Sequence, residues 1–470
     1  MSYIGEYKRD TLLSPISVTF EVILEVLLPM LMAKVIDNGV EAGNMNYVVK
    51  MGLLMLVVAM LSLAAGTLSG VFAARASMGF GKNLRKAMYD NIQDFSFQNI
   101  DHFSTAGLVT RMTTDVTNVQ NAYQMLLRMF VRAPISMVCA MIMSFYINAK
   151  LASIYLVAVI ILGACLFFII SRVSGYFQEV FKKYDDLNAS VQENIAGIRV
   201  VKAYVREDYE DKKFSKASYN VYKMFVKAEK ILSYNAPLMQ FAVYSCILGI
   251  SWLGAMIVTD QLTTGELMSL LTYCMNILMS LMMVSMVFVM VSMSVASAER
   301  ITEVLEEKPE LTNPERPVTE VKDGSIVFDH VNFSYKKGNG EYVLKDINLN
   351  IHAGETIGII GGTGSAKSSL VNLISRLYDV TTGSIKVGGM DVRSYDMETL
   401  RNQVAVVLQK NVLFSGTILE NLRWGNKEAS KEECIRACQL ACADEFIEKM
   451  PEGYETYIEQ GGSNVSGGQK

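Results

Sequence analysis

The sequence predicts two parts of different fold class, an all-α membrane domain of six helices followed by an α/β domain of the P-loop type. Six long apolar segments occupy the first 300 of 470 residues, after which the apolar residues alternate with polar ones. A composition of 51% hydrophobic residues is also too apolar for an ordinary soluble protein. We expect the membrane domain to span 1–305, a linker 306–324, and the α/β domain 325–470.

The six apolar segments are each long enough to cross a bilayer as a helix, which takes about 20 residues. They run over Leu12–Ile36, Val48–Ala74, Leu126–Ile147, Leu151–Ser171, Pro237–Val258 and Leu267–Ala296. Helical periodicity continues beyond the second and fourth segments, so we expect two long hairpins that extend outside the membrane.

The basic residues predict the orientation of these helices, because Lys and Arg accumulate in cytoplasmic segments. The connections at 37–47 and 259–266 carry neither residue, whereas the segments around Arg75 and Lys182 are rich in both. We therefore expect a multi-pass protein of the plasma membrane, with both termini, both hairpins and the α/β domain in the cytoplasm.

Two features inside the predicted membrane helices are candidates for a substrate cavity. Glu21 and Glu25 lie one turn apart on one helix, where a charged side chain is costly; either they handle a polar or cationic substrate, or they pair with a neighbouring helix. A methionine stripe that includes Met279 and Met286 follows one helix face, and either lines a binding wall or packs against lipid and other helices.

The net charge of −4 argues against nucleic acid as a partner, because phosphate binding requires a basic surface. The seven cysteines include no Cys-x-x-Cys pair, and no histidine lies near them, so a structural metal site is not expected. Composition thus points to the lipid bilayer as a partner and away from nucleic acid.

The linker contains three of the eight prolines, Pro309, Pro314 and Pro317. Alternating apolar residues from Ile326 onward then predict strands. The segment "TIGIIG" is interpreted as a buried strand and "KSSLVNLISRLY" as a helix, which gives the strand, glycine loop and helix order that a phosphate-binding loop requires.

The loop between them is "GGTGSAKSS". Its backbone N–H groups and Lys367 suit phosphates, and Ser368 suits Mg²⁺. Ala366 replaces the usual second glycine; if its backbone has positive φ, alanine costs about 1–2 kcal/mol there. The candidate nucleotide-binding residues are Gly361, Gly362, Thr363, Gly364, Ser365, Ala366, Lys367, Ser368 and Ser369.

With six membrane segments, this loop, "VVLQKNVLFSGTILENLRWG" and "GGSNVSGGQK", the chain resembles an ATP-binding cassette (ABC) exporter of the half-transporter type. The resemblance covers essentially the whole chain. It implies ATP and Mg²⁺ as cofactors, Tyr335 as the aromatic that stacks on adenine, and Gln409, with Ser368, as a ligand of Mg²⁺. "VSGGQ" matches the family signature, here Ser466, Gly467, Gly468 and Gln469.

The resemblance further implies a dimer in which each ATP lies between the P-loop of one subunit and the signature of the other. The segments "STAGLVTRMTTDVTNV" and "QENIAGIRVVKAYVRE" resemble hairpin tips that carry motion to the membrane domain. The altered P-loop and the signature region most resemble subunits of bacterial heterodimeric multidrug exporters, so a second, different half-transporter is the favoured partner.

The family's Mg²⁺-holding Asp, catalytic Glu and switch His follow the signature, and none occurs before Lys470. We therefore expect no catalytic residue within this sequence, an incomplete α/β domain, and a chain that is part of a longer protein. The predicted function is ATP-driven export of hydrophobic or amphipathic compounds. The alternatives are a non-catalytic regulatory membrane subunit that binds ATP, or an exporter of lipids or peptides.

Overall fold

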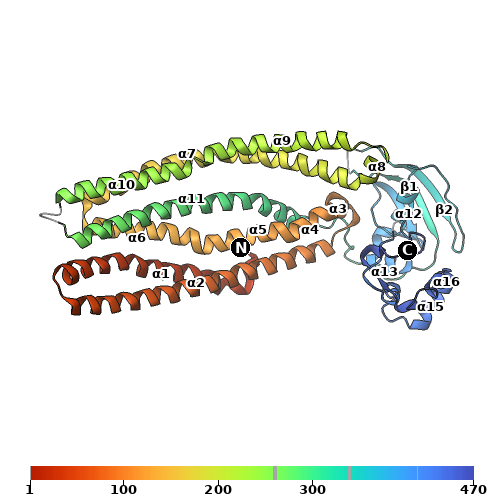
Figure 1. Cartoon of the computed structure of the whole chain (residues 1–470). Helices are drawn as coiled ribbons and strands as arrows, with labels where there is room; N and C mark the ends of the chain where they lie inside the picture. The colour runs from red at the N-terminus through yellow and green to blue at the C-terminus, as the bar shows by residue number, and fades with distance from the viewer. Residues whose placement is uncertain (1, 258–261, 337–339, 410) are drawn as a thin grey trace. The chain divides into compact units, whose positions relative to one another are not determined.

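The computed structural model describes residues 2–257, 262–336, 340–409 and 411–470 (Figure 1). The chain divides into two compact units, each described by itself below. Unit 1 comprises Met1–Phe95 and Asn99–Pro309, and unit 2 comprises Ser96–Gln98 and Glu310–Lys470.

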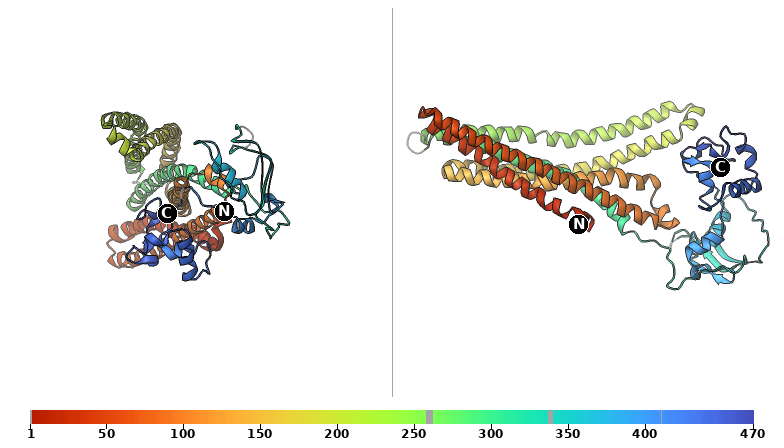
Figure 2. Two further views of the ribbon diagram at one scale, coloured as in Figure 1. Left: turned by 90° about the vertical axis from the view of Figure 1, so that its right-hand side faces the viewer. Right: turned by 90° about the horizontal axis from the view of Figure 1, so that it is seen from below.

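Unit 1 consists of helices, the longest of which run side by side (Figures 1 and 2). The long helices are α1 (Lys8–Val35), α2 (Met45–Gln93), α6 (Val131–Ile147), α7 (Ala149–Ala196), α9 (Glu207–Leu232), α10 (Asn235–Ile257) and α11 (Thr264–Glu306). The shorter segments are η1 (Ser2–Tyr7), η2 (Ile36–Glu41), α4 (Thr105–Thr110), η3 (Arg111–Asp115), α5 (Val116–Met125), η4 (Leu126–Phe130) and α8 (Ile198–Ala203). Helix α3 (Phe97–His102) begins with two residues of unit 2 and continues in unit 1. Within the described residues, six helical stretches are long and apolar enough to span a membrane, which confirms the number predicted.

The core of unit 1 lies where α1, α7 and α11 meet. Val22 of α1 is fully buried there. Two buried tyrosines join the helices through backbone carbonyls: Tyr155 donates to the Leu270 oxygen at 3.1 Å, and Tyr273 donates to the Val26 oxygen at 2.7 Å. A buried hydroxyl needs such a partner, so these contacts fix the packing of α1 and α7 on α11.

Unit 2 contains a four-stranded antiparallel sheet in the order β2-β1-β3-β4. Its strands are β1 (Ile326–Phe333), β2 (Leu344–Ile351), β3 (Thr382–Val387) and β4 (Met390–Asp391), and a second small sheet pairs β5 (Gly416–Thr417) with β6 (Tyr457–Ile458). The helical segments are α12 (Lys367–Ile374), η5 (Val392–Ser394), α13 (Met397–Gln403), α14 (Ile418–Leu422), α15 (Lys431–Leu440), α16 (Asp444–Ile447), η6 (Gly453–Glu455) and η7 (Gln460–Gly462). Helix α12 packs through the fully buried Leu373 against Phe328 and Ile385 of the sheet.

The prediction of a buried strand at "TIGIIG" is wrong. Residues 356–361 have no regular secondary structure, and Ile360 is 98% exposed. An apolar segment becomes a buried strand only when neighbouring strands supply hydrogen bonds and cover its faces. Within the described residues no strand pairs with this segment, and the segment 404–409, which carries the exposed Val407, is also irregular.

Candidate functional site

The P-loop turns into helix α12 through two residues with left-handed backbone. Gly364 has φ of 85°, and Ala366, at the N-cap of α12, has φ of 61° and ψ of 22°. Glycine adopts this region freely, whereas alanine there costs about 1–2 kcal/mol. The sequence predicts a conformational cost for Ala366 if its φ is positive, and this condition is met.

The side chain of Lys367 lies across the loop. Its Nζ donates to the carbonyl oxygens of Gly361 and Gly362, both at 2.8 Å, and to the Ser365 hydroxyl at 3.2 Å. A Cβ added at Gly362 would meet nothing within 4 Å, so that side of the loop is open. The loop therefore presents a cation and backbone groups at an open surface, as phosphate binding requires.

The two serines at the start of α12 differ in environment. Ser368 is exposed, so its hydroxyl can reach a metal ion outside the protein, whereas Ser369 is buried. Ser369 Oγ lies 2.8 Å from the hydroxyl of Tyr335, whose ring packs at its edge against Phe333 and Tyr378, with centroids 4.7 and 5.2 Å apart. The structure thus brings Tyr335 to the helix that follows the P-loop.

Gln409 is exposed at the end of the irregular segment 404–409. The predicted role of Gln409 beside Mg²⁺ requires it to approach Ser368, and no hydrogen bond in the described part of the chain joins the two residues. The role of Gln409 as a Mg²⁺ ligand therefore remains a prediction, whereas the candidate residues of the P-loop lie together.

The signature forms a hydrogen-bonded turn in which Ser466 and Gln469 cap each other. The backbone N–H of Ser466 donates to Gln469 Oε1 at 2.8 Å, and the Gln469 N–H donates to Ser466 Oγ at 3.4 Å. Ser-x-x-Gln is the pattern of a capping box, which explains why these two residue types stand three apart.

The two glycines of the signature, Gly467 and Gly468, are not needed by the fold. Neither has positive φ, and a Cβ added at either would meet nothing within 4 Å. Bare backbone at an exposed turn permits the close approach of another molecule. The signature is therefore shaped for a contact outside its own chain.

The residues present fit ATP with Mg²⁺. The P-loop supplies backbone donors and the Lys367 charge for phosphates, Ser368 supplies a hydroxyl for the metal, and Tyr335 supplies an aromatic ring with 40% of its surface exposed.

Comparison with known proteins assigns both units. Residues 11–299 match the family model described as "ABC transporter transmembrane region", and residues 344–470 match the model described as "ABC transporter". The chain belongs to the ABC transporter family. Its two matched regions, in this order on one chain, make it an ABC exporter half-transporter.

Bacterial relatives align with the half-transporter over its length. It is 35% identical to an uncharacterised ABC transporter ATP-binding protein, YfiB, of Bacillus subtilis, over 100% of this chain and 82% of the relative. It is 34% identical to another uncharacterised member from Mycobacterium tuberculosis, over 100% of this chain and 81% of that protein. An ATP-dependent lipid A-core flippase of Desulfotalea psychrophila is 31% identical over 85% of this chain and 70% of its own. Members of this family couple ATP to transport across membranes.

In the membrane unit of the half-transporter, Glu21 and Glu25 both pair with one arginine. Arg132 of α6 donates through Nη1 to Glu21 Oε1, and through Nη2 to Glu25 Oε2 at 2.6 Å. Sequence reasoning left pairing and substrate binding open, and this geometry establishes the pairing. The partner could not be found from the sequence, since more than 100 residues separate it from the glutamates.

The methionine stripe of α11 is exposed on unit 1. Met279 and Met286 are 66% and 60% exposed, so neither packs inside this chain. Both face lipid or another molecule, and neither lines the cavity that contains Glu21 and Glu25.

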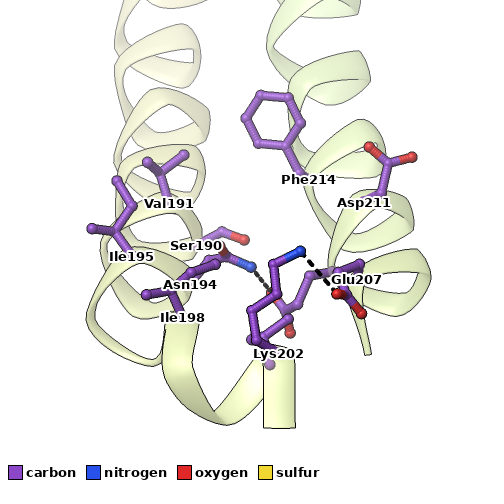
Figure 3. Close-up of a pocket in the computed structure, with 11 residues that line it drawn as sticks. Ser190, Val191, Asn194, Ile195, Ile198, Lys202, Glu207, Asp211 and Phe214 are labelled. Carbon is purple, nitrogen blue, oxygen red and sulfur yellow. Dashed lines mark hydrogen bonds and ion pairs between the residues drawn. The ribbon is translucent and has the colours of Figure 1, made fainter. Parts of the chain in front are cut away.

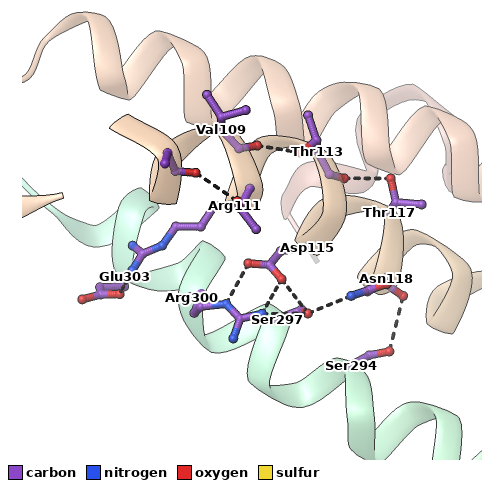
Figure 4. A network of polar contacts seen from close by, with 12 residues as sticks. Val109, Arg111, Thr113, Asp115, Thr117, Asn118, Ser294, Ser297, Arg300 and Glu303 are labelled. Carbon is purple, nitrogen blue, oxygen red and sulfur yellow. Dashed lines mark hydrogen bonds and ion pairs between the residues drawn. The ribbon is translucent and has the colours of Figure 1, made fainter. Parts of the chain in front are cut away.

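A second charged cluster, which sequence reasoning missed, joins η3 to α11 (Figure 4). Asp115 is 1% exposed and accepts from Arg300 Nε at 2.8 Å, from Arg300 Nη2 at 2.5 Å, and from the Ser297 hydroxyl at 2.9 Å. Asn118 Nδ2 donates to Ser297 Oγ at 3.2 Å. The only sequence signal was an acidic residue in a predicted hairpin segment.

The two predicted hairpin tips contain short helices. Helix α4 begins at its N-cap Ser104, whose hydroxyl accepts from the Gly107 N–H at 3.1 Å. Helix α8 lies between α7 and α9 beside a cavity of about 320 Å³, where Lys202 pairs with Glu207 at 2.9 Å (Figure 3). Both tips therefore have the local structure expected of the segments that the resemblance pointed to.

Proposed function

We propose that this half-transporter exports hydrophobic or amphipathic compounds as one half of a dimer, and that its signature acts on ATP held by the other half. The observation that carries the proposal is the bare turn at Gly467 and Gly468, whose glycines serve neither the backbone nor packing within the chain. A phosphate group can approach such a turn closely, and its exposed N–H groups favour an anion.

In this arrangement the chain contributes to two different nucleotide sites. At its own site the P-loop and Lys367 hold the phosphates of ATP, Ser368 and Gln409 hold Mg²⁺, and Tyr335 stacks on adenine. At the partner's site Ser466 and the signature glycines contact the outer phosphate. ATP binding at both sites favours the closed pair, and its hydrolysis removes that preference and resets the transporter.

The strained Ala366 supports a heterodimer with unequal sites. Its methyl group stands where the P-loop pattern has glycine, and its φ of 61° disfavours any residue with a Cβ. A loop held at this cost suits a site that binds ATP without rapid turnover. The partner's P-loop, completed by the intact signature of this chain, then performs most of the hydrolysis.

The orientation proposed from the basic segments places both hairpin tips and unit 2 in the cytoplasm, where ATP is present. The relatives are bacterial, which supports the plasma membrane of a bacterium as the location.

ATP turnover by the reconstituted transporter tests the proposal. Gly468→Asp places a negative charge where a phosphate approaches, so we expect turnover to be abolished, while Lys367→Ala only slows it a few-fold. Gly324→Asp is the matched control, because Gly324 also has an open Cβ position but lies in the linker. Equal loss in the Gly468 and Lys367 variants would contradict unequal sites, and turnover that no amphiphile stimulates would favour a regulatory subunit instead.

A further inference from the structure

A cavity of about 440 Å³ in unit 1 lies among α1, α2, η4 and α6. Six of the residues that line it carry the argument: Glu21, Glu25, Gly66, Gly70, Arg128 and Arg132. It thus holds two carboxylates and two guanidinium groups, with no net charge, inside helices that span the membrane. Ionisable residues within membrane-spanning helices are rare and usually mark a pathway or a binding site.

The carboxylates keep acceptor capacity after they pair with Arg132. Glu21 is buried, and its Oε2 has no hydrogen-bond partner. The side chain of Glu25 is 46% exposed and gives only Oε2 to Arg132. A carboxylate offers about four acceptor positions. One ammonium group can therefore be bound at Glu25 without breaking the existing pairs.

Arg128 is the unused cation of the cavity. Within the residues that the structure describes, its guanidinium has no hydrogen bond or ion pair, although it offers five donors. It stands on η4, a π-helical segment, and such segments often occur at functional sites. A guanidinium whose donors are unused is a strong site for phosphate.

The free cation and the Glu21 carboxylate approach positions on α2 that are one helical turn apart. A Cβ on Gly70 would lie 3.6 Å from Arg128 Nη1, and a Cβ on Gly66 would lie 2.8 Å from the Glu21 carboxylate. Residues four apart on a helix have Cβ positions about 5–6 Å from each other. Glu25 lies one further turn along α1 and lines the same cavity, so a ligand that extends along the cavity can contact both Arg128 and Glu25.

We propose that this cavity binds the headgroup of a zwitterionic amphiphile, with its phosphate at Arg128 and its primary ammonium at Glu25, as in an ethanolamine phospholipid. The inference rests on the proposed export of amphipathic compounds and specifies their charge. A purely anionic headgroup meets Arg128 but faces an unmatched carboxylate, and a purely cationic one meets Glu25 but faces an unmatched guanidinium. Only a ligand with both charges satisfies the cavity without a buried unpaired charge.

Arg132 is a positioning residue in this site, because it holds both glutamates through one guanidinium. Gly66 leaves the room that the Glu21 carboxylate occupies, since a Cβ there would lie too close to it. The site is thus built by α1, α2 and α6 together.

Native mass spectrometry of the full chain in detergent tests the proposal by counting bound lipids. The probes are phosphatidylethanolamine, phosphatidylglycerol and dodecyltrimethylammonium. We expect phosphatidylethanolamine to bind at least about tenfold more tightly than either other probe, and Arg128→Gln and Glu25→Gln each to reduce that preference to near unity. The control Arg75→Gln, on the exposed face of α2, should leave it unchanged. Equal binding of all probes, or a preference that survives both variants, would overturn the proposal.

Gly70→Leu provides a test that removes no charge. Its side chain fills the space beside Arg128, so it should abolish selective binding while the thermal stability of the protein stays near that of the parent chain. Retained selectivity in this variant would also overturn the proposal.

ATP turnover separates this proposal from the proposed function. If amphiphiles stimulate ATP turnover but lipids bind without selectivity, the proposed headgroup site is wrong and the proposed export function is still supported. Selective binding without any stimulated turnover rejects export and leaves the cavity standing.

Discussion

The membrane unit contains two charged clusters that differ in how completely their charges are paired. In the Asp115 cluster (Asp115, Asn118, Ser297 and Arg300), one arginine binds both oxygens of a single buried carboxylate. In the Glu21 cluster (Glu21, Glu25, Arg128 and Arg132), one arginine is divided between two carboxylates, and a second arginine is unpaired among the described residues. The first cluster is saturated, whereas the second keeps a free donor and free acceptors.

The difference shows that charged side chains inside a helical unit can have two roles, joining helices or binding a ligand. Both clusters stand next to a π-helical segment, η3 and η4, where the local change in helical register redirects side chains. A saturated pair joins helices and leaves nothing for a ligand. In an unsaturated cluster, part of the desolvation cost of the buried charges is not offset by pairing. A ligand that supplies the missing hydrogen bonds and charge would offset it.

The largest effect on the free energy of unfolding should come from Arg132→Gln, which removes the cationic partner of two carboxylates in the membrane unit. The Glu21 side chain is only 12% exposed, and breaking a buried ion pair by removing one partner costs about 3–5 kcal/mol; Glu25, at 46% exposed, adds little to this. The free energy of unfolding in mixed micelles measures the loss. Adding Glu21→Gln and Glu25→Gln to the same variant should recover most of it, because no unpaired charge remains. A loss below about 1 kcal/mol in the single variant would contradict the geometry of the cluster.

A smaller effect is expected from Asp115→Asn. Hydrogen bonds to charged groups contribute about 1.5–3 kcal/mol, and the Arg300 side chain is 49% exposed, so water can solvate it once the carboxylate is gone. A double-mutant cycle with Arg300→Gln measures the coupling between the two residues. If Asp115→Asn proved more costly than Arg132→Gln, the contrast between the saturated and the unsaturated cluster would be reversed.

A substitution that relieves backbone strain in unit 2 provides a stability change, without any change in charge, to compare with the two above. Ala366→Gly removes a Cβ at a φ of 61°, so we expect a gain of about 1 kcal/mol in the stability of unit 2. Thermal unfolding followed by tryptophan fluorescence is suitable in a Trp252→Phe background, since Trp252 lies in unit 1 and Trp424 in unit 2. A loss of stability would mean that the methyl group makes packing contacts of greater value than the strain.

The smallest effect should come from the exposed pair of His330 and Asp346, whose ring nitrogen and carboxylate oxygen lie 2.7 Å apart. The carboxylate raises the pKa of His330, and the imidazolium lowers the pKa of Asp346. The histidine's contribution is therefore complete below its ordinary pKa and lost as pH rises through the raised value. The aspartate's contribution is lost as pH falls through its lowered value.

His330→Asn should therefore flatten the slight pH dependence of unit 2 stability above pH 6, with almost no change in its maximum. Melting curves of the variant and the parent chain between pH 5 and 9 measure this. A large stability loss would show that an exposed ion pair contributes as much to the free energy of unfolding as a buried one, contrary to the order of effects given above.

Much of the fold could be predicted from the sequence because its signals are local. Apolar length gave the six membrane helices, and the Gly-rich loop before "KSSL" gave the start of α12. The strand at "TIGIIG" could not be judged this way, since pairing with other strands decides it. Arg132 and Arg128 were missed for the same reason. Arg132 pairs with Glu21 and Glu25, and Arg128 lines the same cavity, only through the packing of helices distant in sequence.

ATP-driven movement of a labelled amphiphile tests the central claim most directly. Proteoliposomes with the assembled transporter and a fluorescent phosphatidylethanolamine report its transfer between leaflets when a membrane-impermeant quencher is added. The account predicts transfer that requires ATP, stops with Gly468→Asp, and is lost with Arg128→Gln but kept with Arg75→Gln. An ATP-independent signal, or no transfer of this or any other amphiphile, would contradict it.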